Sequence, residues 1–224
     1  MKTRKLMQGL AVITTLCASA SALHAQGLSV FAMGSVSSLF DKRDYGISAA
    51  SFSSAYKTGG GVTLGAEFSL NRIVGAEGSY SNVRNNLAVT DSSTSAEFGY
   101  GVHDQRFSGD LLAHAPKAFF GLKPYFAGGL EYDHFSQPGS SSSIFNGFSG
   151  VTLGAANKIG VNYGGGVDMK LLPFISLRVD VRDHVMTSPT YGLPSKSSVG
   201  PFYPIGGIAH DLEYSAGLVF HVGK

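Results

Sequence analysis

Apolar residues alternate with polar or very small residues along most of this sequence, and that period of two limits the fold more than any other feature. Successive side chains of a β-strand point to opposite faces, so each such segment has one apolar and one polar face. In residues 175–182, four aliphatic side chains alternate with Ser176, Arg178, Asp180 and Arg182. Three charges in alternation with four aliphatic residues would make a poor helix, so the pattern predicts strands.

Eight segments carry the alternation, and the connections between them alternate in length. The predicted strands are residues 28–36, 62–70, 74–81, 106–113, 125–132, 159–169, 175–182 and 211–222. Tight turns are expected near residues 71–72, 115–116 and 171–173, and long connections around residues 38–58, 83–105, 135–157 and 187–210. Short turns and long loops then fall at opposite ends of the strands. We therefore expect an all-β chain that forms an antiparallel up-and-down β-barrel of about eight strands.

The first 25 residues have the pattern of a secretory signal peptide. Lys2, Arg4 and Lys5 form a positively charged start, and an apolar stretch over residues 10–16 follows before a run of small residues. We expect cleavage after Ala25, although the Ala-Ser-Ala sequence just upstream offers a competing site. Residues 26–224 are then expected to form a single exported domain.

The composition of the exported part fits a β-rich protein that binds no nucleic acid. Once the leader is removed, 14 basic residues stand against 15 acidic ones, so no basic surface is expected. The sole cysteine, Cys17, lies inside the leader, which leaves no disulfide in the exported domain. Beyond the leader no apolar run approaches the roughly 18 residues that a membrane-spanning helix needs. If the protein crosses a membrane, it therefore does so with strands.

The polar face of the predicted barrel carries ionisable side chains on successive strands. In a soluble barrel such as a lipocalin these groups would face water, whereas in a transmembrane barrel they would face the lumen. The export leader, the alternating loop lengths, and the many glycine and serine residues on the same face favour a transmembrane barrel. The residues expected in the lumen are Glu67, Glu77, Arg106, Asp110, Glu131, Asp168, Arg178, Asp180, Arg182 and Glu213.

An eight-stranded barrel is only just wide enough to be filled by its own side chains. We therefore expect these acids and bases to form a structural network of ion pairs and not to line a wide pore. Because acids outnumber bases in this set, some carboxylates are expected near the rims or against trapped water.

Three stretches of the sequence resemble the outer-membrane β-barrel superfamily that includes the OmpA transmembrane domain, OmpX and the opacity proteins. They are residues 123–130, 178–182 and 214–222. The resemblance implies a place in the bacterial outer membrane, contact with outer-membrane lipid, and recognition by the barrel-assembly machinery. The residues that resemble its assembly signal are Ser215, Gly217, Phe220 and Val222.

No motif specifies a catalytic, cofactor or metal site, and none is expected. His134 and Ser136 share the parity of the lipid face, as a lipid A-modifying barrel enzyme would require, but such a pair is common by chance. The other histidines lack metal-ligand spacing, and the glycine triplets at residues 59–61 and 164–166 do not open helices. Three functions stay open: a monomeric scaffold that displays loops to an unknown extracellular ligand, which is favoured, a narrow channel for small solutes, and a lipid A-modifying enzyme.

Overall fold

The structure is a computed structural model that describes residues 27–40, 43–47, 50–91, 95, 97–136, 154–189, 191 and 207–222. The predicted signal peptide lies outside these residues. The described strands are β1 (Leu28–Phe40), β2 (Arg43–Ile47), β3 (Ala50–Ser69), β4 (Val74–Asp91), β5 (Glu97–His114), β6 (Leu122–Ser136), β7 (Ala156–Leu172), β8 (Ile175–Thr187) and β9 (Ile208–Val222). Within the described ranges, no helix is long and apolar enough to cross a membrane.

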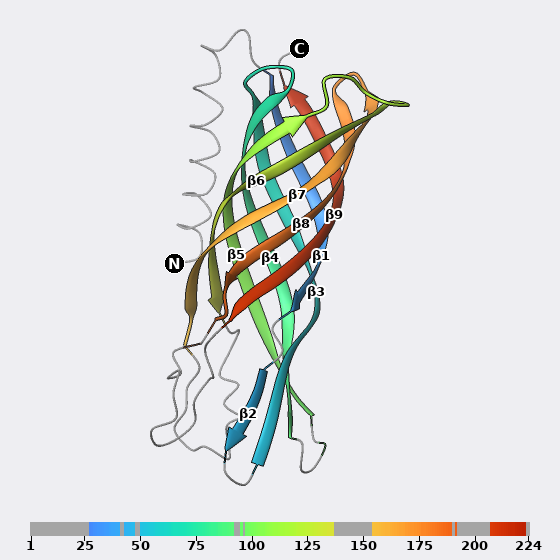
Figure 1. The fold of residues 1–224 in the computed structure, drawn as a ribbon. Coiled ribbons are helices and arrows are strands. Elements are labelled where there is room, and N and C mark those ends of the chain that lie inside the picture. The colour runs from blue at the N-terminus through green and yellow to red at the C-terminus, as the bar shows by residue number, and fades with distance from the viewer. Residues whose placement is uncertain are drawn as a thin grey trace, which may run out of the picture.

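The strands form one antiparallel sheet that closes on itself (Figure 1). Each strand from β3 to β8 pairs with the next along the chain, and β1 pairs with both β9 and β3. Closure leaves no unpaired edge along the wall. The short strand β2 pairs only with the beginning of β3, below the barrel in the view of Figure 1. The barrel itself is therefore eight-stranded and up-and-down, as the alternation predicted.

The two ends of the barrel differ. At one end, here called the turn rim, lie the start of β1, the end of β9 and the short connections at residues 70–73, 115–121 and 173–174. The connection before β6 is a tight turn in which Phe120 and Gly121 both have positive φ, at 51° and 79°, as a type I′ hairpin requires. The opposite end, here called the loop rim, receives the longer connections of the sequence.

The strands are longer than the sequence predicted. Strand pairing continues through β3 from Ala50, through β4 to Asp91, from Glu97 in β5 and through β8 to Thr187, so the long loops predicted over these residues were wrong. The reason is that backbone pairing does not require an apolar outer face. Near the loop rim the pattern reverses, because Asn82 and Arg84 point outward while apolar side chains point into the barrel.

The outer wall is apolar and the lumen is mostly polar. Along the middle of the strands the outward side chains are large, exposed and apolar, such as Leu111, Phe126 and Leu130. Tyr80 and Phe107 pack against each other on this surface with ring centroids 4.9 Å apart. Because water would not favour so large an apolar surface, the wall has the character of a lipid-facing band.

The lumen is closed near the loop rim by a cluster of buried apolar side chains, here called the apolar plug. Its members are Leu39, Leu87, Val102, Phe135, Ala156, Met186, Tyr191 and Ala209. Tyr56 packs against the plug, and its hydroxyl is hydrogen-bonded to that of Tyr191. No water-filled passage is expected through such a packed apolar layer.

Candidate functional site

The candidate site is the charged lumen between the turn rim and the apolar plug. All ten residues that the sequence placed there point inward, and nine of them belong to the buried polar and charged residues, whereas Asp168 is partly exposed near the turn rim. They form two clusters that lie at different heights along the barrel.

The cluster nearer the turn rim contains two arginines of β8 and is here called the paired-arginine cluster. Its arginines bind five carboxylates, from Glu67, Glu77, Asp110, Asp168 and Asp180.

Arg178 makes contacts that link three different strands to β8. Its guanidinium donates to Glu67 at 2.6 Å, to Glu77 at 2.9 Å and to Asp168 at 2.7 Å. The same guanidinium lies over the ring of Tyr125, 4.7 Å from its centroid. Such charge-assisted bonds and the cation–π contact hold the arginine across the lumen.

Arg182 lies two residues further along the same face of β8. It donates to Asp110 at 2.6 Å, to Glu77 at 2.7 Å and to Asp180 at 2.9 Å. Glu77 is therefore shared, because one of its oxygens binds Arg178 and the other binds Arg182. This sharing couples the two arginines.

Tyr125 completes the paired-arginine cluster from β6. Its hydroxyl donates to Asp180, and its ring fits against β7 where that strand carries glycine. A Cβ atom at Gly166 would lie 2.7 Å from the Tyr125 hydroxyl oxygen, which is too close for any side chain. One glycine of the 164–166 triplet therefore makes room for a lumen side chain, and the triplet forms part of β7.

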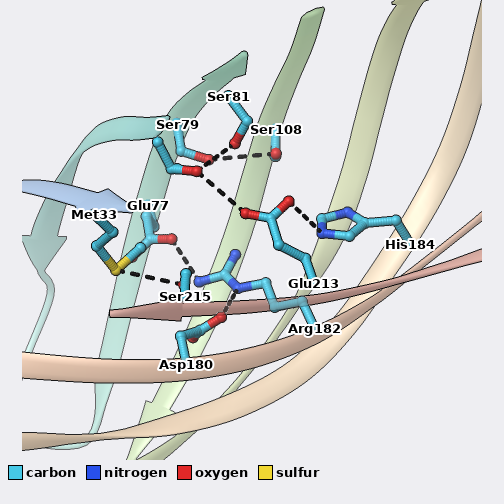
Figure 2. A pocket seen from close by; sticks show the side chains of 11 residues that line it. Met33, Glu77, Ser79, Ser81, Ser108, Asp180, Arg182, His184, Glu213 and Ser215 are labelled. Carbon is cyan, nitrogen blue, oxygen red and sulfur yellow. Dashed lines mark hydrogen bonds and ion pairs between the residues drawn. The ribbon is translucent and has the colours of Figure 1, made fainter. Parts of the chain in front are cut away.

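On the loop-rim side of the paired-arginine cluster lies a small cavity lined by hydroxyl groups and by ionisable side chains (Figure 2). Thr63 is hydrogen-bonded to Ser81 at 2.8 Å and donates to Glu213 at 3.2 Å, and Ser79 donates to Ser108 at 3.3 Å. The cavity volume is about 20 Å³, which is close to the space that one water molecule needs. The lumen here can hold water but no larger solute.

The second cluster lies between this cavity and the apolar plug and is here called the single-arginine cluster. Arg106, whose side chain is 0% exposed, binds four carboxylates that come from β5, β6 and β9. The partners are Asp133 at 2.7 Å, Asp104 at 2.8 Å, Asp211 at 2.8 Å and Glu213 at 3.0 Å. All three nitrogens of the Arg106 guanidinium therefore donate to acids, through four hydrogen bonds.

The single-arginine cluster holds further acidic and polar groups. His184 is 2.6 Å from Glu131 and 3.7 Å from Glu213, and the hydroxyl of Ser37 donates to Asp211 at 2.5 Å. One oxygen each of Asp104, Glu131 and Asp133 is buried without a hydrogen-bond partner. In the described part of the chain, however, no three His, Cys, Asp or Glu residues are arranged to hold a metal ion.

Several lumen residues were missed by the sequence argument. Asp104 fell in a predicted loop, and Asp133 lay one residue beyond a predicted strand. Asp211 was assigned to the polar face but not to the network. Extending the inward parity by two residues at each strand end would have found the first two and would also have placed His114 and His184 in the lumen. Nothing in the pattern, however, marks Glu67 and Glu131 as the partners of these histidines.

The other sequence candidates lie apart from the clusters. His134 points outward and its ring contacts Asn157 at 2.6 Å, and no described hydrogen bond joins it to Ser136. In the stretch that resembles an assembly signal, Ser215 is buried and Gly217 faces the lumen, while Phe220 and Val222 point outward. Recognition of that stretch by the assembly machinery stays a prediction.

Comparison with known proteins finds the same β-barrel fold in a family model and in solved structures. The family described as "Outer membrane protein beta-barrel domain" matches residues 9–200, and no curated protein matches the sequence. The outer membrane protein OprG from Pseudomonas aeruginosa is 13% identical, with coverage of 90% of this chain and 98% of that chain and a TM-score of 0.60. The outer membrane protein AlkL, solved in DMPC bilayers, is 14% identical, with coverages of 88% and 90% and a TM-score of 0.54. At these identities the likeness to solved structures shows the fold alone.

Proposed function

The chain belongs to the outer membrane protein beta-barrel family and lies in the bacterial outer membrane, and from this premise we propose that it is a sealed, non-enzymatic scaffold for the loops of its loop rim. In barrels of this kind the short turns and both termini face the periplasm, and the long loops face outward. The turn rim is then periplasmic and the loop rim extracellular.

The observation that carries this proposal is the closure of the lumen by side chains from opposite walls. Arg106 on β5 reaches Glu213 on β9, and Arg178 on β8 reaches Glu67 on β3. The apolar plug closes the barrel again on the loop-rim side of these ion pairs. A barrel filled at three heights serves better as a rigid support than as a pore, because any solute would have to displace buried ion pairs.

A scaffold role also agrees with the difference in sequence between the strands and the connections at the loop rim. The wall and lumen carry the packing and the ion pairs, whereas the connections at the loop rim, such as the serine-rich residues 137–143, carry no wall-forming pattern. In membrane barrels the scaffold is shared and the loops vary with function. We propose that the loops contact an extracellular ligand and that the barrel acts as a monomer surrounded by outer-membrane lipid.

The proposal is tested by replacing residues 139–151 with a Gly-Ser linker of equal length. A scaffold should keep its folded, heat-modifiable mobility in SDS gels, because its stability comes from the paired strands of the wall and the contacts of the lumen. In the same preparation, vesicles that contain the wild-type protein should retain trapped glycine, and lipid A incubated with it should keep its mass. Rapid glycine release would favour a narrow channel, and a changed lipid A mass would favour an enzyme.

A further inference from the structure

A second cavity opens at the turn rim, the upper end of the barrel in Figure 1, on the periplasmic side of the paired-arginine cluster. Its volume is about 220 Å³, below the roughly 300 Å³ at which pockets for drug-sized ligands begin. It is large enough for several water molecules or for one small organic ion. The charged and polar side chains that line it come from β1, β3, β5, β6, β7, β8 and β9.

The acids of this cavity are already bound by other side chains. Glu67 binds Arg178 at 2.6 Å and His114 at 2.8 Å, and Asp168 binds Arg178 at 2.7 Å. Both carboxylates therefore direct their charge toward the paired-arginine cluster, at the inner end of the cavity.

The two lysines of the cavity, unlike its acids, lack an ion-pair partner among the described residues. Lys123 at the start of β6 and Lys170 near the end of β7 both line it, and in the described residues no carboxylate lies within 4.0 Å of either ammonium group. Asp168 is the direct cross-strand neighbour of Lys123, but its oxygens bind Arg178. Among the residues that the structure describes, these two lysines thus face the cavity without an ion-pair partner.

The remaining polar groups supply hydrogen bonds around the same space. Ser29 and Ser176 hold the two ring nitrogens of His221 at 2.9 Å and 2.8 Å, which fixes that ring at the wall. His114 is 6% exposed, and its Nδ1 is buried without a hydrogen-bond partner. Because these hydroxyl and imidazole groups are bonded to one another or buried, the donors left for a ligand are the two lysine ammonium groups, which favour a ligand with several acceptor oxygens.

We propose that this periplasmic vestibule binds a small oxyanion, a carboxylate or phosphate that enters from the periplasm. Lys123 and Lys170 supply the charge, and the cross-lumen Arg178 behind them blocks further passage. The ligand would thus be held at the inner mouth and not transported, which separates this site from the loops at the opposite rim. A small cation finds no comparable place, because the carboxylates of the cavity are occupied by Arg178 and His114.

The test uses the purified full-length exported protein in detergent micelles, titrated with inorganic phosphate and separately with succinate. Binding is followed by the amide NMR signals of the turn-rim residues at fixed ionic strength. We expect saturable chemical-shift changes for at least one of the two anions. The anion that binds with the lower dissociation constant shows whether the site prefers a phosphate or a carboxylate. The Lys123→Gln, Lys170→Gln double variant should raise the dissociation constant at least tenfold.

Lys117 provides a matched control, since it is an exposed lysine of the neighbouring 115–121 turn that does not line the cavity. Lys117→Gln should bind like the wild type, and the charge-preserving Lys123→Arg, Lys170→Arg variant should keep binding even if the glutamine variant folds poorly. The proposal is overturned if neither anion saturates the wild type, if Lys117→Gln weakens binding as much as the double variant, or if the arginine variant folds and does not bind.

Discussion

The two charged clusters of the lumen differ in how many cations hold their carboxylates. In the single-arginine cluster, Arg106 alone binds four acids. In the paired-arginine cluster, Arg178 and Arg182 bind five acids and share Glu77. Removal of one arginine therefore has different consequences at the two heights of the barrel.

This difference shows that the carboxylates of a buried network can all depend on one cation or can be divided between two cations. A buried ion pair is weak evidence for net stability, but loss of one partner leaves the other charge stranded at a large cost. In the single-arginine cluster four acids share one guanidinium. In the paired-arginine cluster the shared Glu77 keeps a partner when either arginine is lost.

The largest effect is expected from Arg106→Met, which keeps the length of the side chain and removes its charge. Four buried carboxylates lose their cation, so we expect a loss of about 5 kcal/mol in the free energy of unfolding. This loss is measured by urea titration of the protein in lipid vesicles, in which the folded fraction is read from its heat-modifiable gel mobility. Adding Asp133→Asn and Asp211→Asn should restore part of the loss, and unchanged stability of Arg106→Met would show that the cluster does not depend on this arginine.

A smaller effect is expected from Arg178→Met or Arg182→Met, about 3 kcal/mol each by the same titration. Because Glu77 loses its last cation only when both are replaced, the double variant should lose more than the sum of the two single losses, by about 1 kcal/mol. Additive losses would mean that the sharing of Glu77 has no energetic weight.

A third prediction tests the assignment of faces on which both clusters depend. Val179 lies on the lipid side of β8 between Arg178 and Asp180, so Val179→Arg should cost about 2 to 4 kcal/mol near the middle of the membrane. Leu171→Arg at the turn rim is the depth control and should cost about 1 kcal/mol or less. Equal losses at the two positions would contradict the assignment of Val179 to the lipid-facing side of β8.

The smallest effect concerns a single hydrogen bond in the single-arginine cluster. Ser37→Ala removes the donor to Asp211 and should lower the unfolding free energy by about 2 kcal/mol, because the acceptor is charged and buried. The matched control is Ser38→Ala, the next residue of β1, whose hydroxyl bonds Thr58 on the exposed side. The loss for Ser38→Ala should stay within about 0.5 kcal/mol. Similar losses of unfolding free energy in the two variants would mean that any serine replacement in β1 destabilises the barrel, and that the hydrogen bond to Asp211 has no special weight.

The same comparison explains what could be predicted from the sequence. Arg178, Asp180 and Arg182 alternate with aliphatic residues in mid-strand, where lipid on one side and lumen on the other enforce the pattern. The paired-arginine cluster could therefore be found. Three of the four acids around Arg106 were missed, two of them because near the loop rim polar residues face outward and apolar residues fill the lumen. Pairing partners across the barrel depend on closure and register, which no single strand encodes.

The most direct test of the sealed barrel is the current through single proteins in a planar lipid bilayer at neutral pH. With the apolar plug and both clusters in place, the wild type should give no steady open level, and Arg178→Met should give at most small, irregular conductance while its stability falls. A large and steady current through the wild type, or through a fully stable Arg178→Met variant, would contradict a lumen closed by its own side chains.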